Sequence, residues 1–157
     1  MKPLICTTET TTVSDFLGVD NINADPAHQR PQIQDNSKRK GIVQAMVDGY
    51  DIGEIKLNQY SSEPIELEVI DGSNRLRSIK QFFNNEFSIS EKTFTDLSSD
   101  EQDIFLNYPL RYIIYDNLSA RDKCKLVLTI CHISLNLWVY FAPAEHDRHL
   151  ETNQRPR

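Results

Sequence analysis

The first clear pattern along the chain is a helical one between Lys38 and Asp48. Its apolar side chains recur at helical intervals: Ile42, Val43, Met46 and Val47. This spacing places them on one face of a helix. Ser37 stands where an N-cap is expected, and Gly49 stands where a helix commonly stops. We therefore predict a helix between these two residues.

Two short runs that follow have the spacing of strands. The first is residues 55–57, and the second is residues 65–70, in which three apolar side chains alternate with two glutamates. Such alternation is typical of a strand with one apolar face. The intervening residues 61–64 read Ser-Ser-Glu-Pro, a turn signal. The two runs are therefore expected to pair as a β-hairpin.

The rest of the chain continues to mix helical and strand patterns. A helical stripe follows Gly72, and an apolar strand is expected at residues 110–115. The shorter predicted elements are small strands at 87–89 and 92–94, a helix capped by Ser98, and a helix from Ser119 to about Ile130. This mixed order predicts an α+β or an α/β fold.

Composition narrows the class of protein. The 157 residues include 17 basic and 23 acidic side chains, giving a net charge of −6, and 39% of them are apolar. These values favour one globular domain with a core of its own. No apolar run has the length of a membrane span or the form of a signal peptide. The expected location is therefore the cytoplasm, with no membrane partner.

The acidic balance argues against nucleic-acid binding over the whole surface, although a local basic patch can still bind DNA. The basic cluster that the sequence offers is Lys38, Arg39 and Lys40. It is either a solvated helix start or a DNA contact. The three cysteines form no C-x-x-C pair, which argues against a zinc ribbon or a disulfide framework.

The segment richest in chemistry is the sharp turn from the predicted strand into the next helix, with the sequence Asp-Gly-Ser-Asn-Arg. The first amides of a helix lack an acceptor within it, and the helix dipole adds positive charge, so this place attracts anions. Gly72 permits close backbone approach, and Ser73 and Asn74 can cap the helix or contact the anion. Arg75 offers a planar fork for phosphate, and Asp71 can hold Mg²⁺ or orient a water. The alternative is an ordinary capped turn whose arginine pairs with a surface carboxylate.

A second polar segment precedes the first helix. Gln29 and Arg30 lie in a loop bounded by Pro26 and Pro31. Held between two prolines, they can aim a second guanidinium at the same anion. The alternative is an ordinary surface loop.

Taken together, these segments resemble a known family in four ordered blocks. The blocks are residues 28–31, 42–49, 52–57 and 69–79. They are similar to the N-terminal domain of GmrSD-type modification-dependent restriction proteins, which is related to the ParB/sulfiredoxin fold. The resemblance covers residues 13–120. It implies an α+β fold, with a small mixed sheet and flanking helices.

The resemblance also implies nucleotide chemistry. In the family, the Asp-Gly-x-x-Arg turn is associated with binding or hydrolysis of a nucleoside triphosphate, in systems that serve DNA restriction and phage defence beside a separate nuclease region. Gln29 and Arg30 fall on its first motif, and Asp71, Gly72 and Arg75 fall on its second. Asp71 would be the Mg²⁺ ligand or the water-orienting carboxylate. Arg75, together with Arg30, would neutralise phosphate charge.

Departures from the family pattern leave two functions open. Ser73 and Asn74 stand where the family has two glutamines, and these shorter side chains weigh against hydrolysis more than against binding. The first hypothesis is a nucleotide-binding domain of a restriction or phage-related system, with hydrolysis left open. The alternative is a non-enzymatic, ParB-like DNA-binding or regulatory module that uses residues 38–40.

The sequence suggests three regions. Residues 1–12 are expected to be extended or disordered, residues 13–120 form the GmrSD-like domain, and residues 121–157 form a helix with an irregular tail. Within the last region, residues 133–141 are largely apolar. They are either a buried element or a surface that contacts a protein partner or a nuclease subunit.

Overall fold

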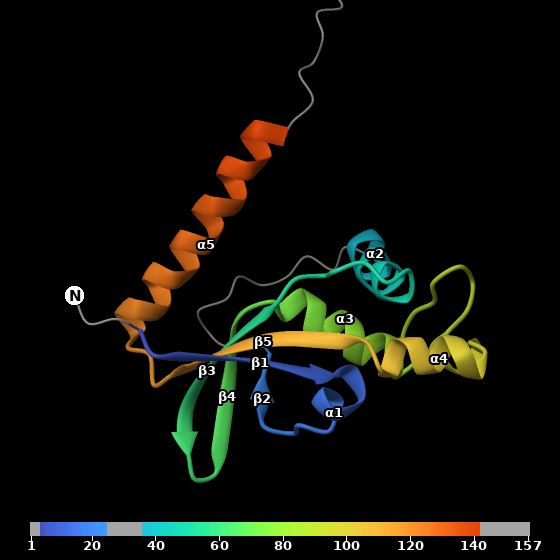
Figure 1. Cartoon of the computed structure of the whole chain (residues 1–157), viewed down its shortest axis with the longest axis horizontal. Coiled ribbons are helices and arrows are strands. Elements are labelled where there is room, and N and C mark those ends of the chain that lie inside the picture. The colour runs from blue at the N-terminus through green and yellow to red at the C-terminus, as the bar shows by residue number, and fades with distance from the viewer. Residues whose placement is uncertain (1–3, 25–35, 142–157) are drawn as a thin grey trace, which may run out of the picture.

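A mixed β-sheet forms the centre of the computed structural model, which describes residues 4–24 and 36–141, with side chains as far as Ile130. The strands in these residues are β1 (Cys6–Thr12), β2 (Ile22–Asn23), β3 (Ile55–Ser62), β4 (Ile65–Asp71) and β5 (Pro109–Asp116). They lie in the order β1-β5-β3-β4-β2 (Figure 1). β3 and β4 pair antiparallel, which confirms the predicted hairpin. β5 runs parallel to β3 and antiparallel to β1, and β2 runs parallel to β4.

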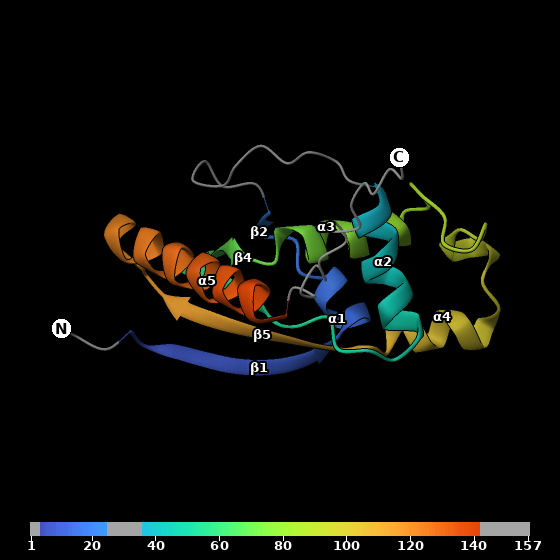
Figure 2. The ribbon, with the colours of Figure 1, turned by 90° about the horizontal axis from the view of Figure 1, so that it is seen from above.

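The described residues also form helices beside this sheet. They are α1 (Val13–Leu17), α2 (Asn36–Val47), α3 (Ser73–Phe83), α4 (Ser99–Leu106) and α5 (Ala120–Phe141). Figures 1 and 2 show α1 to α4 gathered toward one end of the sheet, whereas α5 begins at the other end and, in Figure 1, rises away from the sheet. The arrangement confirms the α+β class, with a small mixed sheet and flanking helices.

Several helix ends follow the capping residues that the sequence indicated. At α4, Ser98 accepts a hydrogen bond from the Glu101 amide, and the Glu101 carboxylate accepts one from the Ser98 amide at 2.8 Å. At α5, the Ser119 hydroxyl accepts from the Asp122 amide at 3.2 Å. Gly49 follows α2 with a φ of +78°, the left-handed conformation that glycine adopts readily.

The hydrophobic core has an aromatic centre on α3. The ring of Phe82 lies with its centroid 5.6 Å from Phe87, 6.1 Å from Phe94 and 5.3 Å from Phe105. Phe82 and Phe105 are completely buried. Because aromatic side chains bury large areas and favour such tilted contacts, this cluster fixes α3 against α4 and the loop between them.

The stretch after α3 differs from the two small strands that the sequence suggested. Its pairing consists of one antiparallel bridge between Ile89 and Lys92, and a 3₁₀ turn, Phe94–Asp96, follows. Thr93 caps this turn through a capping box with the last residue of the turn. The first residue of the turn packs its ring against Phe82. The apolar residues of this stretch therefore pack into the aromatic cluster and do not form paired strands.

α5 is longer than predicted. It continues past Ile130 to Phe141, because neither glycine nor proline interrupts residues 120–141. The apolar residues 133–141 therefore belong to this helix, and their contact with a partner stays a prediction. Within the part of the chain that the structure describes, no helix is long and apolar enough to cross a membrane.

A polar network covers part of the sheet face opposite the apolar side chains of β4. Glu68, only 9% exposed, accepts a hydrogen bond from Asn58 Nδ2 at 2.8 Å and forms an ion pair with Lys123 of α5. Asn58 is completely buried, and its Oδ1 accepts from the Leu118 amide at 2.8 Å. The network thus joins β3 and β4 to the start of α5. The alternating pattern of β4 gave no sign that its glutamate would be buried.

Replacing Asn58 tests this network. Asn58→Ala removes a bond to a buried carboxylate and another to a buried amide, and it should lower the free energy of unfolding by about 2–3 kcal/mol. Asn84→Ala, at an exposed position after α3, is the control and should change stability by less than about 1 kcal/mol. Urea unfolding followed by circular dichroism measures both, and equal effects would contradict the network's role.

Candidate functional site

The site begins where β4 turns directly into α3. β4 ends at Asp71, Gly72 occupies the N-cap position, and α3 starts at Ser73. Gly72 has a φ of +98°, and a Cβ built on it would lie 3.1 Å from Ile55 Cγ1 and 3.2 Å from Ile55 Cα. Both the conformation and the close approach require glycine. The strand therefore passes into the helix without an intervening loop.

The start of α3 has the features of an anion site. Gly72 offers no side-chain hydrogen bond to cap the helix, and amides of a first helical turn have no acceptor within the helix. Because the cap is Gly72, neither Ser73 nor Asn74 caps the helix, contrary to one of the roles that the sequence allowed. Ser73 is 4% exposed, whereas Asn74 is exposed and can contact a ligand.

Arg75, in the first turn of α3, is held by two acceptors. Its Nη1 donates to the carbonyl oxygen of Glu54, and its Nη2 lies 3.4 Å from Asp71 Oδ2. A Cβ on Gly53 would lie 3.3 Å from Nη1, so the loop before β3 approaches the guanidinium closely. Arg75 is therefore oriented from two sides, by the backbone just before β3 and by the carboxylate of Asp71 at the end of β4.

Lys56 is a second cation at this junction, and no local pattern in the sequence points to it. Its Nζ lies 2.8 Å from Glu54 Oε1 and 4.0 Å from Asp71 Oδ2. Lys56 and Asp71 are paired across the hairpin, next to a shift of register. Only the strand register could have revealed this contact, because the two residues lie far apart in the sequence.

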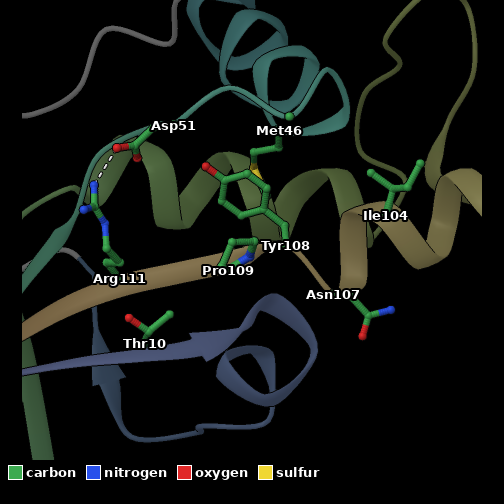
Figure 3. Close-up of a pocket in the computed structure, with 9 residues that line it drawn as sticks. Thr10, Met46, Asp51, Ile104, Asn107, Tyr108, Pro109 and Arg111 are labelled. Carbon is green, nitrogen blue, oxygen red and sulfur yellow. Dashed lines mark hydrogen bonds and ion pairs between the residues drawn. The ribbon is translucent and has the colours of Figure 1, made fainter.

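The loop that carries Glu54 is fixed from the side of β5. The Tyr108 hydroxyl donates to the Tyr50 carbonyl at 2.9 Å and accepts from the Ile52 amide at 3.1 Å. Asp51 pairs with Arg111 at 2.5 Å, as Figure 3 shows. The pKa of Asp51 is lowered, first by a hydrogen bond from the backbone amide of Gly53 and further by Arg111.

These residues also border an open pocket of about 470 Å³. Its lining includes Met46, Ile104, Tyr108 and Arg111 (Figure 3). Among the residues that the structure describes, none of those predicted for the site lines this pocket. Its walls come from β1, α2, the loop before β3, α4 and the beginning of β5. The pocket and the junction at Gly72 are therefore separate features.

The remaining predicted site residues lie elsewhere. Gln29 and Arg30 fall outside the described residues. In α2, Lys38 and Lys40 are exposed. Arg39 donates to Gln81 Oε1 at 2.8 Å, and its guanidinium lies 5.5 Å from the centre of the Phe87 ring. One member of the basic triplet is therefore used in packing α2 against α3, and DNA contact by the triplet stays a prediction.

A metal ion is poorly supported by protein groups alone. Among the described residues, no three histidine, cysteine or acidic side chains gather as a metal site. Asp71 has two cations beside its Oδ2, which opposes a bare divalent ion. Mg²⁺ is often held by one or two carboxylates together with substrate phosphates. The geometry of Asp71 fits that arrangement better than a metal site made by the chain itself.

A family model for the N-terminal domain of the GmrSD restriction endonuclease matches residues 13–147. The chain belongs to this family. Neither the comparison with curated proteins nor that with solved structures found a match. The matched range of the GmrSD domain contains the whole junction at Gly72 and all of α5. Membership connects the chain with DNA restriction.

Replacing Gly72 tests the backbone of the GmrSD domain at the site. Gly72→Ala places a side chain at a left-handed φ and against Ile55, and it should lower the free energy of unfolding by about 1–3 kcal/mol. Gly41→Ala is the matched control, because nothing lies within 4 Å of its added Cβ. In a helix interior that change should instead stabilise by about 0.5–1 kcal/mol. Thermal unfolding measures both, and a neutral Gly72→Ala would contradict the packing described.

Proposed function

We propose that this chain is the nucleotide-binding domain of a DNA restriction system, and that it receives the phosphates of a nucleoside triphosphate at the start of α3. The observation that carries the proposal is the first turn of α3, whose N-cap glycine has no side chain to occupy it, with the Arg75 guanidinium beside it. Backbone amides and the helix dipole attract anions there, and a guanidinium suits phosphate oxygens.

Two polar side chains of the site are accessible to a ligand. Asn74 is exposed, and the side chain of Arg75 is 22% exposed. Ser73 is buried, so we do not expect its hydroxyl to contact phosphate. Gln29 and Arg30, which precede α2 in the sequence, remain proposed contributors.

Mg²⁺ would accompany the triphosphate, with Asp71 as its protein ligand. A metal bound to phosphates offsets their charge. The chain's own part is to orient Asp71, which lies between Arg75 Nη2 and Lys56 Nζ. This orientation serves binding whether or not the nucleotide is then hydrolysed.

Binding is better supported than hydrolysis. A side chain that positions an attacking water must reach past the terminal phosphate. Ser73 is buried and Asn74 is one methylene shorter than the glutamine of the family pattern. We therefore propose a domain that binds or senses the nucleotide, with turnover at most slow.

The proposal is tested by a thermal-shift screen of ATP, GTP, CTP and UTP with Mg²⁺. A ligand that binds the native state raises the melting temperature, by an amount that corresponds to about 2.7 kcal/mol at one hundred times its Kd. At least one nucleotide should raise it for the native chain. No shift with any of the four would reject the proposal.

Arg75→Ala locates the binding. It removes charge-assisted bonds worth about 1.5–3 kcal/mol, so the affinity for the nucleotide should fall by at least about tenfold. Arg77→Ala is the matched control, because it removes the same charge two positions along α3, on another side of the helix. Calorimetric titration measures both affinities. Equal losses in the two variants would place the nucleotide elsewhere.

A further inference from the structure

The junction contains two charged side chains to which the proposed function gives no contact with the phosphates, Lys56 and Glu54. We propose that Lys56 is a second phosphate-binding cation, and that the Glu54 carboxylate occupies it until a polyphosphate displaces that carboxylate. Glu54 is in this sense an internal competitor of the ligand. The inference rests on the proposed function, because it concerns the same site.

The backbone brings these groups to one face of the hairpin. Glu54 immediately precedes β3, and Lys56 is its second residue. Side chains two positions apart along an extended chain point to the same side. Lys56 is paired with Asp71 across the hairpin, so the three side chains form a row that leads to the start of α3.

Both cations approach the same carboxylate oxygen. Asp71 Oδ2 lies 3.4 Å from Arg75 Nη2 and 4.0 Å from Lys56 Nζ. A ligand that binds beside Asp71 therefore meets two positive charges, one from α3 and one from β3. A chain of linked phosphates presents negative charge at more than one position, which a single phosphate does not. The ligand class that fits is a diphosphate or triphosphate.

Exposure indicates which group the ligand meets first. The side chains of Lys56 and Arg75 are 16% and 22% exposed, whereas those of Glu54 and Asp71 are 35% and 30% exposed. Each carboxylate is thus more open to solvent than the cation beside it. A partly buried ammonium group requires a counter-charge, and Glu54 supplies it at 2.8 Å. A phosphate that reaches Lys56 must take the place of this carboxylate.

The Glu54 side chain can leave while its backbone stays in place. The carbonyl oxygen of Glu54 accepts from Arg75, and the preceding Gly53 amide donates to Asp51 Oδ1 at 2.8 Å. The Glu54 side chain is the more exposed partner of the pair, at 35%, and an incoming phosphate would replace it as the counter-charge of Lys56. Exchange of one carboxylate for a more highly charged polyphosphate is therefore favourable without refolding of the loop.

The experiment measures the affinity for sodium tripolyphosphate, and for ATP with Mg²⁺, by calorimetry. Glu54→Gln keeps the shape of the side chain and removes the competing charge, so both probes should bind about five- to tenfold more tightly. Glu63→Gln is the matched control, because it makes the same change of net charge in the β3–β4 turn, at the other end of the hairpin. It should change the affinity less than twofold. Thermal unfolding of each variant verifies that it is folded.

A double variant separates the roles of the two residues. Lys56→Gln should weaken binding, and adding Glu54→Gln to it should give no further gain, because the carboxylate acts by occupying that lysine. Equal affinities of the Glu54→Gln and Glu63→Gln variants would overturn the inference. A gain that persists without the lysine would overturn it as well.

The same titrations distinguish this inference from the proposed function. If neither the native chain nor the Glu54→Gln variant binds either probe, both proposals fail. If the native chain binds and loses binding with Arg75→Ala, but Glu54→Gln has no effect on affinity, only the role of Glu54 is rejected. The four charged groups would then be an ion cluster that joins β3 to α3.

Discussion

At Gly72 the chain passes from a buried strand into a largely buried helix with no loop between them, and the rest of the site depends on this passage. The glycine adopts a positive φ and lies so close to Ile55 that a Cβ would crowd that residue. Because the turn is this tight, Asp71 and Arg75, four positions apart, contact each other. The start of α3 lies at the end of the hairpin for the same reason.

The surrounding structure holds the other side of that junction in place. Tyr108, just before β5, binds two backbone groups of the segment before β3, and Arg75 binds the Glu54 carbonyl. α3 is fixed from behind by Phe82 in the aromatic core. The charged groups of the site on β3, β4 and α3 are thereby held in place by the hydrophobic core and a few backbone hydrogen bonds. This lowers the entropic cost of ordering them when a ligand binds.

Local patterns were sufficient to predict the hairpin, most helix starts and the turn that contains Asp71 and Arg75, because caps, turns and hydrophobic spacing act over a few residues. Features that depend on the placement of distant segments were not predictable. The contact of Lys56 with Asp71 follows from strand register, and the burial of Glu68 follows from the position of α5. The sequence around Phe94 looked like a strand because apolar β-formers also pack into aromatic clusters.

The most direct test of the central claim is a nuclear magnetic resonance titration of the isotope-labelled chain with the nucleotide. If the phosphates lie at the start of α3, the amide resonances of residues 72–75 should move first and farthest. The Lys56 amide should move with them, and those of α2 around Arg39 should stay. Saturable shifts confined to α2, to the pocket beside Tyr108 or to α5 would contradict the account.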